Sequence, residues 1–187
     1  MTTRLTNLAV PFVFRFAVTT SGTPEQLSVK RRAATIGFSE NTADPDTITD
    51  SASGFLVAGF QPGDQITVSG SASNDGTYTI ASVAAGTITL LGRNDLTTEA
   101  AGATVKITAP KTVPEGVGVT VKALNANGGI IHIGYSSATA LNTAGGSFTL
   151  DNNESVGLQV ENVSNIWLDA TVSGEGVEII YEKNVQA

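Results

Sequence analysis

The sequence predicts an all-β protein: an antiparallel β-sandwich of the jelly-roll or immunoglobulin-like kind, with a small β-barrel-like domain inserted into it. Among its 187 residues are 20 Gly, and charged residues make up only 14%, against roughly 25% in typical soluble domains. Apolar side chains recur at every second position, which is the period of a strand, and no segment keeps the helical i, i+3, i+4, i+7 pattern. With 41% hydrophobic residues, the chain can bury a core.

The longest alternating runs lie near the two ends of the chain. Each predicts a strand with one apolar face turned toward a core. Their apolar members are Phe12, Phe14, Phe16 and Val18; Val117, Val119, Val121 and Ala123; Val156, Leu158 and Val160; and Val177, Ile179 and Tyr181. A further strand is expected over residues 130–135, with Ile131, Ile133 and Tyr135 facing inward.

The middle of the chain has shorter strands that are rich in threonine. They are expected at residues 35–38, 47–49, 66–68, 78–80, 88–90 and 104–108. The sequence Asn74-Asp75-Gly76 is a strong hairpin signal between two of them. Pairing of the first and last of these strands would bring the ends of the region together, as an inserted domain requires.

The contrast between long and short strands predicts a nested organisation. Residues 1–32 and 110–187 would form a discontinuous outer sandwich, and residues 33–109 would form the insert. The alternative is two sequential domains, with residues 1–32 as an arm. Within the nested reading, residues 1–8 are a possible arm that a neighbouring subunit orders, or a disordered tail.

Composition argues against several classes of function. The 10 Lys+Arg against 17 Asp+Glu give a net charge of −7, whereas nucleic-acid binding needs a basic surface. The chain has no Cys and one His, so most zinc and non-haem iron sites would lack ligands. The apolar run over residues 8–14 contains Pro11, is too short to span a membrane, and lacks the cleavage signature of a signal peptide. We therefore expect no cofactor, no nucleic acid and no membrane partner.

His132 is the only histidine, and in a strand over residues 130–135 it would point away from the core. A Ser-His-Asp triad needs a buried histidine beside a nucleophile in a rigid elbow, and no Gly-X-Ser-X-Gly motif is present. We predict a solvated or interface histidine, and no catalytic residue.

Two groups of carboxylates were weighed as sites. Asp44, Asp46 and Asp50 could offer oxygen ligands to calcium, but their spacing is not that of an EF-hand loop, so an acidic surface loop is expected and no metal site is assigned. A glycosidase needs two carboxylates around a cleft. The second group instead falls in a turn and on strands, so a charged outer face is expected there; it comprises Asp169, Glu175, Glu178 and Glu182.

Apolar residues at outward positions are the more informative feature. If Ile166 and Leu168 face inward then Trp167 faces outward, and Ile180 faces outward for the same reason. Exposed aromatic and branched side chains often mark contact surfaces. The candidate interface residues are Trp167, Ile180, His132 and Leu124; packing of the insert on them, or chance exposure, are the alternatives.

Several segments resemble small β-sandwich structural proteins that tailed bacteriophages encode. These segments lie within residues 8–30 and 110–183, and they include 113–117, 121–129, 131–134, 150–156, 163–170 and 177–182. Residues 46–50, 59–70 and 74–80 are similar to a small β module that recurs in phage virion proteins. The resemblance implies a virion component on the capsid surface or at the neck or tail, and it carries no catalytic residues.

The expected function is therefore non-enzymatic. A capsid decoration, or cement, protein would dock as a homo-oligomer on the major capsid protein or another virion protein, with many weak contacts adding up. One alternative is a neck, collar or tail component. Another is a carbohydrate-binding or adhesive module, for which Trp167 and Tyr135 are the aromatic candidates.

Overall fold

A computed structural model describes residues 8–92, 95–143 and 145–185. The chain divides into two compact units. We call Met1–Leu27 with Lys111–Ala187 the outer unit, and Ser28–Pro110 the inserted unit. The predicted arm over residues 1–8 lies, apart from residue 8, outside the described residues.

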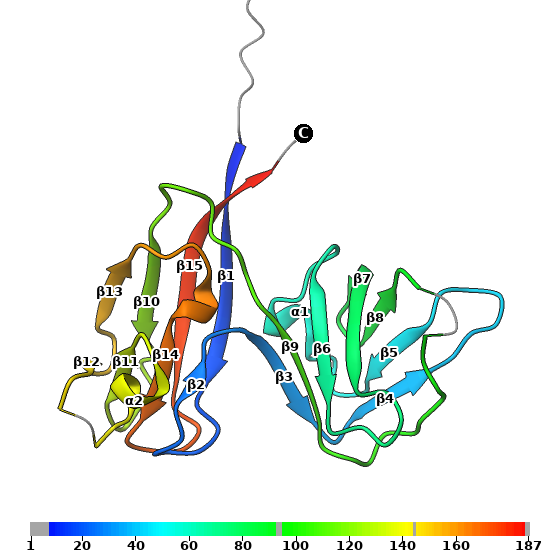
Figure 1. Ribbon diagram of the computed structural model, residues 1–187, viewed down its shortest axis with the longest axis horizontal. Coiled ribbons are helices and arrows are strands. Elements are labelled where there is room, and N and C mark those ends of the chain that lie inside the picture. The colour runs from blue at the N-terminus through cyan, green and yellow to red at the C-terminus, as the bar shows by residue number, and fades with distance from the viewer. Residues whose placement is uncertain (1–7, 93–94, 144, 186–187) are drawn as a thin grey trace, which may run out of the picture. The chain divides into compact units, whose positions relative to one another are not determined.

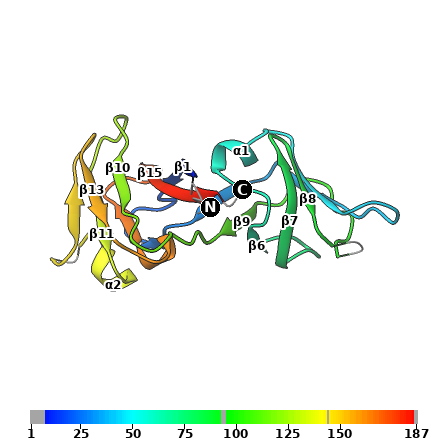
Figure 2. The same ribbon diagram turned by 90° about the horizontal axis from the view of Figure 1, so that it is seen from above.

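The outer unit contains two four-stranded antiparallel sheets (Figures 1 and 2). Sheet I has the order β1-β15-β10-β13, formed by Leu8–Ala17, Gly176–Val185, Val119–Ala123 and Ser155–Leu158. Sheet II has the order β12-β11-β14-β2, formed by Phe148–Leu150, Ile131–Gly134, Trp167–Ala170 and Glu25–Gln26. A 3-10 turn, η1, covers Val163–Asn165. This confirms the predicted all-β class and the β-sandwich.

The core of the sandwich is built from the alternating runs. Every second side chain is buried from Phe12 to Val18 and from Val177 to Tyr181, and the rings of Phe12 and Tyr181 meet edge to face with their centroids 5.3 Å apart. Burial of one such aromatic side chain contributes about 2–3 kcal/mol. The predicted inward sets are confirmed at Phe12, Phe14, Phe16, Val18, Val119, Val121, Ala123, Val177, Ile179 and Tyr181.

The predicted strand over residues 130–135 is shorter than expected. It ends at Gly134, and Tyr135 is 81% exposed instead of facing the core. The chain turns there into a one-turn helix, α2 (Ser137–Ala140), because Ser136 and Thr139 cap it reciprocally. Neither α2 nor any other helix in the described part of the chain is long and apolar enough to cross a membrane.

The inserted unit is one antiparallel sheet, sheet III, of seven strands (Figure 1). Its order is β3-β9-β6-β7-β8-β5-β4, formed by Val29–Ala33, Val105–Ala109, Gln65–Ser69, Gly76–Ala84, Thr87–Leu90, Thr47–Asp50 and Ile36–Ser39. The predicted hairpin at Asn74-Asp75-Gly76 joins β6 to β7. Within the described residues the sheet has two edges, β3 and β4, so the predicted barrel-like closure is absent.

The boundary between the units differs from the predicted one. Residues 29–32 were assigned to the outer domain, but β3 pairs with β9 from Val29↔Ala109 to Ala33↔Val105. The strand that returns alongside β9 is therefore β3, and not the predicted strand at residues 35–38, which pairs with β5. The five residue pairs between β3 and β9 place β3 in the inserted unit, whereas the prediction used only the composition of the segments.

The apolar stretch at residues 55–60 forms a one-turn helix, α1 (Phe55–Ala58). Phe55 and Phe60 are buried edge to face, with ring centroids 6.0 Å apart. Gly59 ends the helix at φ 94°, a left-handed conformation that favours glycine.

Candidate functional site

The outward face of sheet I is the candidate functional site, and we call it the docking face. Because side chains alternate across a strand, the residues between the buried ones all lie on this face. They are Pro11, Val13, Arg15 and Ala17 of β1; Glu178, Ile180 and Glu182 of β15; Thr120 and Lys122 of β10, with Gly118 just before it; and Ser155 and Gly157 of β13.

An apolar row crosses the middle of the docking face. Strand register places Val13 opposite Ile180, Ile180 opposite Thr120, and Thr120 opposite Gly157. Val13 is 46% exposed and Ile180 is 42% exposed. Two large aliphatic side chains therefore stand next to each other in solvent, in a row whose other members, Thr120 and Gly157, are small.

A hollow adjoins this row. Its volume is about 390 Å³, and Thr120 and Ile180 belong both to its lining and to the row. The other lining residues are Pro11, Gly116, Val117, Gly118, Tyr181 and Glu182. An apolar row beside a hollow with one carboxylate at its margin is a surface that can accept a side chain of a neighbouring molecule.

A charged row lies on the other side of the apolar row. Arg15 is opposite Glu178, and Glu178 is opposite Lys122. Arg15 Nε and Glu178 Oε1 are 3.3 Å apart, an exposed ion pair of little stabilising value. With Glu182, the residues of the face named above hold two cations and two carboxylates, so this described part of the face is neutral within a chain of net charge −7.

The four predicted interface residues do not come together. Ile180 lies on the docking face, exposed as expected. Trp167 is half-buried on sheet II, where it pairs with Gly134 and Gln26. Leu124 is half-buried just after β10, and its N–H donates to the carbonyl of Gly176. An interface role for these residues stays a prediction.

His132 is buried, so the predicted solvated position is wrong, while the alternative of an interface histidine stays a prediction. It does lie on the outer face of sheet II, but only 8% of it is exposed. Helix α2 packs on β11 and β14 beside it, and a Cβ on Gly134 would come within 2.4 Å of the Ala140 backbone nitrogen. The capping pair Ser136 and Thr139 was the sequence signal that could have revealed this cover.

The described residues around His132 are polar, but they are not connected to it as in a Ser-His-Asp triad. Its Nδ1 lies 2.7 Å from Ser147 Oγ, and its Nε2 is buried with no hydrogen-bond partner among the residues that the structure describes. Asp169, directly opposite on β14, accepts hydrogen bonds from the N–H groups of Gly22, Ala170 and Asn142. Asp169 thus joins three segments of the outer unit.

Packing of α2 on Gly134 makes a testable prediction. The substitution Gly134→Ala places a methyl group against the α2 backbone, so the helix must shift and His132 becomes more accessible. We expect diethyl pyrocarbonate to modify His132, the only histidine, several-fold faster in this variant. Gly145→Ala is the control, because a Cβ there meets nothing within 4 Å. Equal rates in both variants would show that α2 does not cover His132.

The predicted acidic surface loop is also wrong for two of its three carboxylates. Asp44 is exposed, but Asp46 and Asp50 are buried. Asp46 accepts hydrogen bonds from the N–H groups of Asn41, Asp95 and Leu96. A carboxylate whose oxygens accept N–H groups from two loops holds those loops together, and this role differs from that of a calcium ligand. No cluster of three metal-binding side chains occurs among the residues placed.

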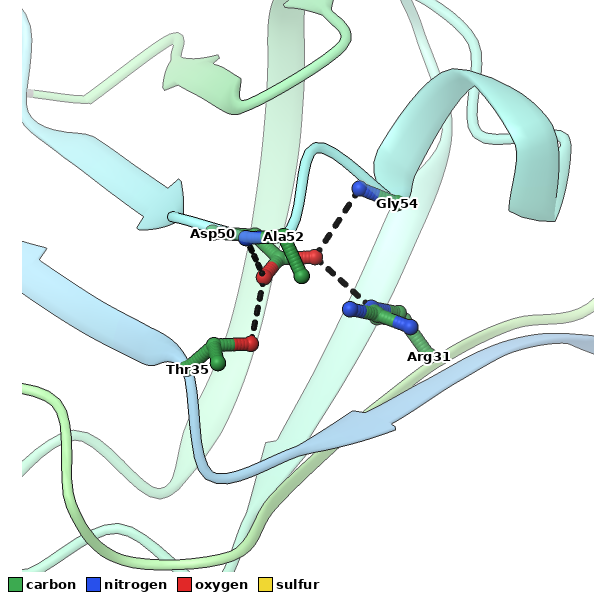
Figure 3. Close-up of polar contacts among 5 residues, drawn as sticks. All are labelled: Arg31, Thr35, Asp50, Ala52 and Gly54. Carbon is green, nitrogen blue, oxygen red and sulfur yellow. Dashed lines mark hydrogen bonds and ion pairs between the residues drawn. The ribbon is translucent and has the colours of Figure 1, made fainter.

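Asp50 is the centre of a second network (Figure 3). Arg31 Nε donates to its Oδ2 at 2.7 Å and Thr35 Oγ1 to its Oδ1 at 2.6 Å, while the N–H groups of Ala52 and Gly54 donate at 3.0 Å. Burial by itself raises the pKa of this carboxyl, but these hydrogen bonds, that from Arg31 first, lower it to about 2 from 3.8. The carboxylate ties β3 and the β3–β4 turn to the start of α1.

Glu175 was expected in an exposed turn, and it too is buried. Its Oε1 accepts hydrogen bonds from the N–H groups of Gly128 and Gly129, so it anchors the loop between β10 and β11. Glu178 and Glu182 do lie on the outward side of β15, as expected. The four carboxylates weighed as a glycosidase site are therefore divided between loop anchors and the docking face.

No protein-family model, curated protein or solved structure matches this chain. Its function must therefore be inferred from its own residues. The neutral, partly apolar docking face, assembled from four strands, is the feature from which that inference starts.

Proposed function

We propose that this chain is a non-enzymatic structural protein of a bacteriophage virion, and specifically a capsid decoration protein that docks as a homo-oligomer on the shell. The observation that carries the proposal is the docking face, where Val13 and Ile180 stand exposed side by side next to a hollow. Such a surface stabilises contacts between neighbouring copies of the chain by burying apolar area, and these contacts hold the homo-oligomer together on the shell. The resemblance of the sequence to phage virion proteins supplies the expected setting.

The mechanism is binding by repeated contact. Each copy contributes a small apolar area, and copies that are held on one particle bind together far more tightly than one copy alone. Loops are held in place by three buried carboxylates that accept hydrogen bonds from them, those of Asp50, Asp169 and Glu175. No proton or electron transfer is part of this function.

The test is to quantify the chain in purified particles by mass spectrometry. A decoration protein is expected at roughly hundreds of copies per particle, and a neck, collar or tail component at about a dozen or fewer. Ile180→Arg should lower the occupancy of the particles, because it places a charge in the apolar row. Particles without this chain would contradict the proposal.

One observation favours a second candidate, a carbohydrate-binding or adhesive module. Tyr135 is 81% exposed and follows Gly134, which pairs with the half-buried Trp167. Exposed aromatic rings are the platforms on which sugars stack. A glycan array probed with the wild-type chain and with Tyr135→Ala separates the two candidates. A carbohydrate-binding module should bind glycans as the wild type and lose this binding in Tyr135→Ala, whereas a decoration protein should give no glycan signal in either form.

A further inference from the structure

We propose that the docking face pairs with the docking face of a second copy of this chain, about a two-fold axis that runs along the strands between β15 and β10. The partner of the docking face is thus a second copy of this chain. This inference rests on the proposed function only in treating that face as an interface, and it can be tested without any virus particle.

The two halves of the docking face differ in the size of their side chains. Across the apolar row, β1 and β15 carry Val13 and Ile180, whereas β10 and β13 carry Thr120 and Gly157. A Cβ added at Gly157 would meet nothing within 4 Å. The face therefore has a raised half and a low half in the same row.

A two-fold axis between the central strands brings these halves together. It lays β15 on β10 of the second copy and β1 on β13, while each row stays on itself. Val13 then stands over Gly157 of the second copy, and Ile180 over Thr120. Large residues meet small ones at every position of the apolar row, as close packing requires.

Charge matches in the same arrangement. In the charged row, Glu178 comes over Lys122 of the second copy. In the row on the opposite side of the apolar row, Glu182 comes over Gly118 of the second copy. The other two-fold axis in the plane of the face, across the strands, would instead place Glu178 on Glu182 of the second copy. Like charges in contact are unfavourable, so the axis along the strands is preferred.

Neutrality of the face points to a second copy as well. Its two cations and two carboxylates cancel, although the chain as a whole carries −7. A strongly basic or acidic partner would gain little from such a face, while two identical copies avoid repulsion there.

Four strands at about 4.8 Å spacing give a face roughly 20 Å wide. An interface of this small size should give a weak dimer, with a dissociation constant in about the micromolar range.

A charge exchange tests the pairing directly. We expect the wild-type chain to sediment as a reversible dimer between about 10 µM and 1 mM. K122E alone and E178K alone should each weaken the dimer by at least about tenfold, because each places like charges in contact across the axis. An equimolar mixture of the two variants should dimerise again, since every cross-axis pair is then opposite in charge. A mixture that stays monomeric overturns the inference, as does a monomeric wild type.

A steric test uses a matched control. G157Y fills the low half of the face and should abolish the dimer, while G145Y, at an equally open glycine outside the face, should dimerise like the wild type. Circular dichroism checks that both variants keep the strand content. A dimer that survives G157Y contradicts the pairing. A monomeric chain that is nevertheless present in particles would leave the proposed function standing and remove only this inference.

Discussion

Asp50→Asn is expected to lower the free energy of unfolding of the inserted unit by about 3 kcal/mol, because it breaks a buried charge-assisted network. Asp50 is only 1% exposed and accepts hydrogen bonds from two side chains, Arg31 and Thr35, and from two backbone N–H groups. An asparagine keeps the shape but replaces one acceptor oxygen with a donor. Its NH₂ group then faces either Arg31 and the N–H group of Gly54 or Thr35 and the N–H group of Ala52, so a backbone donor loses its partner in both orientations.

The same network makes the inserted unit sensitive to acid. The pKa of Asp50 is about 2 in the folded chain and 3.8 without its partners. Because the folded pKa is the lower one, the stabilisation is fully present above pH 4 and is lost as the pH falls through about 2. The shift corresponds to about 2 kcal/mol. The Asp50→Asn variant should lack this part of the acid dependence.

Hydrogen exchange read by mass spectrometry checks both expectations. Peptides from Ser28–Pro110 should lose protection in Asp50→Asn, while peptides of the outer unit keep theirs. Asp44→Asn is the matched control, since Asp44 is an exposed carboxylate on the neighbouring loop. Equal protection in the two variants would mean that Asp50 does not hold the unit together.

Asp169→Asn is expected to destabilise the outer unit by a similar amount, about 2–4 kcal/mol. Asp169 is fully buried, and both of its oxygens accept backbone N–H groups, from Gly22 and Ala170 on one side and Asn142 on the other. An amide in its place must turn its NH₂ group toward one of these donors. The loop before β2 and the segment after α2 then lose their common anchor.

Trp167 provides the measurement, because it is the only tryptophan and lies two residues before Asp169. Urea titration followed by its fluorescence should show a midpoint at lower urea in Asp169→Asn. Asp151→Asn, at an exposed carboxylate of the same unit, should unfold like the wild type. Coincident curves for the two variants would contradict the anchoring role.

Local periodicity was enough to predict the long strands β1, β10 and β15 of the sandwich and their inward faces. Phe12, Phe14 and Phe16 are buried as expected, and so are Val177 and Ile179. The reason is that side-chain direction alternates along any strand, whatever its neighbours are. For the same reason, the outward position of Ile180 was predictable from its own segment.

Burial of the polar residues could not be predicted in this way. His132 and Asp169 do lie at outward positions, but Ser147 contacts the former, α2 packs on the same two strands, and the N–H group of Asn142 donates to the latter. Asp46 accepts hydrogen bonds from the N–H groups of Asp95 and Leu96, which are distant in the sequence, and Asp50 accepts one from the side chain of Arg31 on another strand. Whether an outward side chain meets water depends on what packs over it, and a single segment does not contain that information.

The sequence by itself determined the β class, the alternating core and the acidic, cysteine-free character of this chain, because these depend on composition and on residues two positions apart. Only the tertiary structure decided the docking face. Val13, Thr120, Gly157 and Ile180 become neighbours through the register of four strands drawn from distant parts of the chain. The physical reason is that hydrogen-bonded ladders set which rows form, and the rows set which large, small and charged side chains a second molecule would meet.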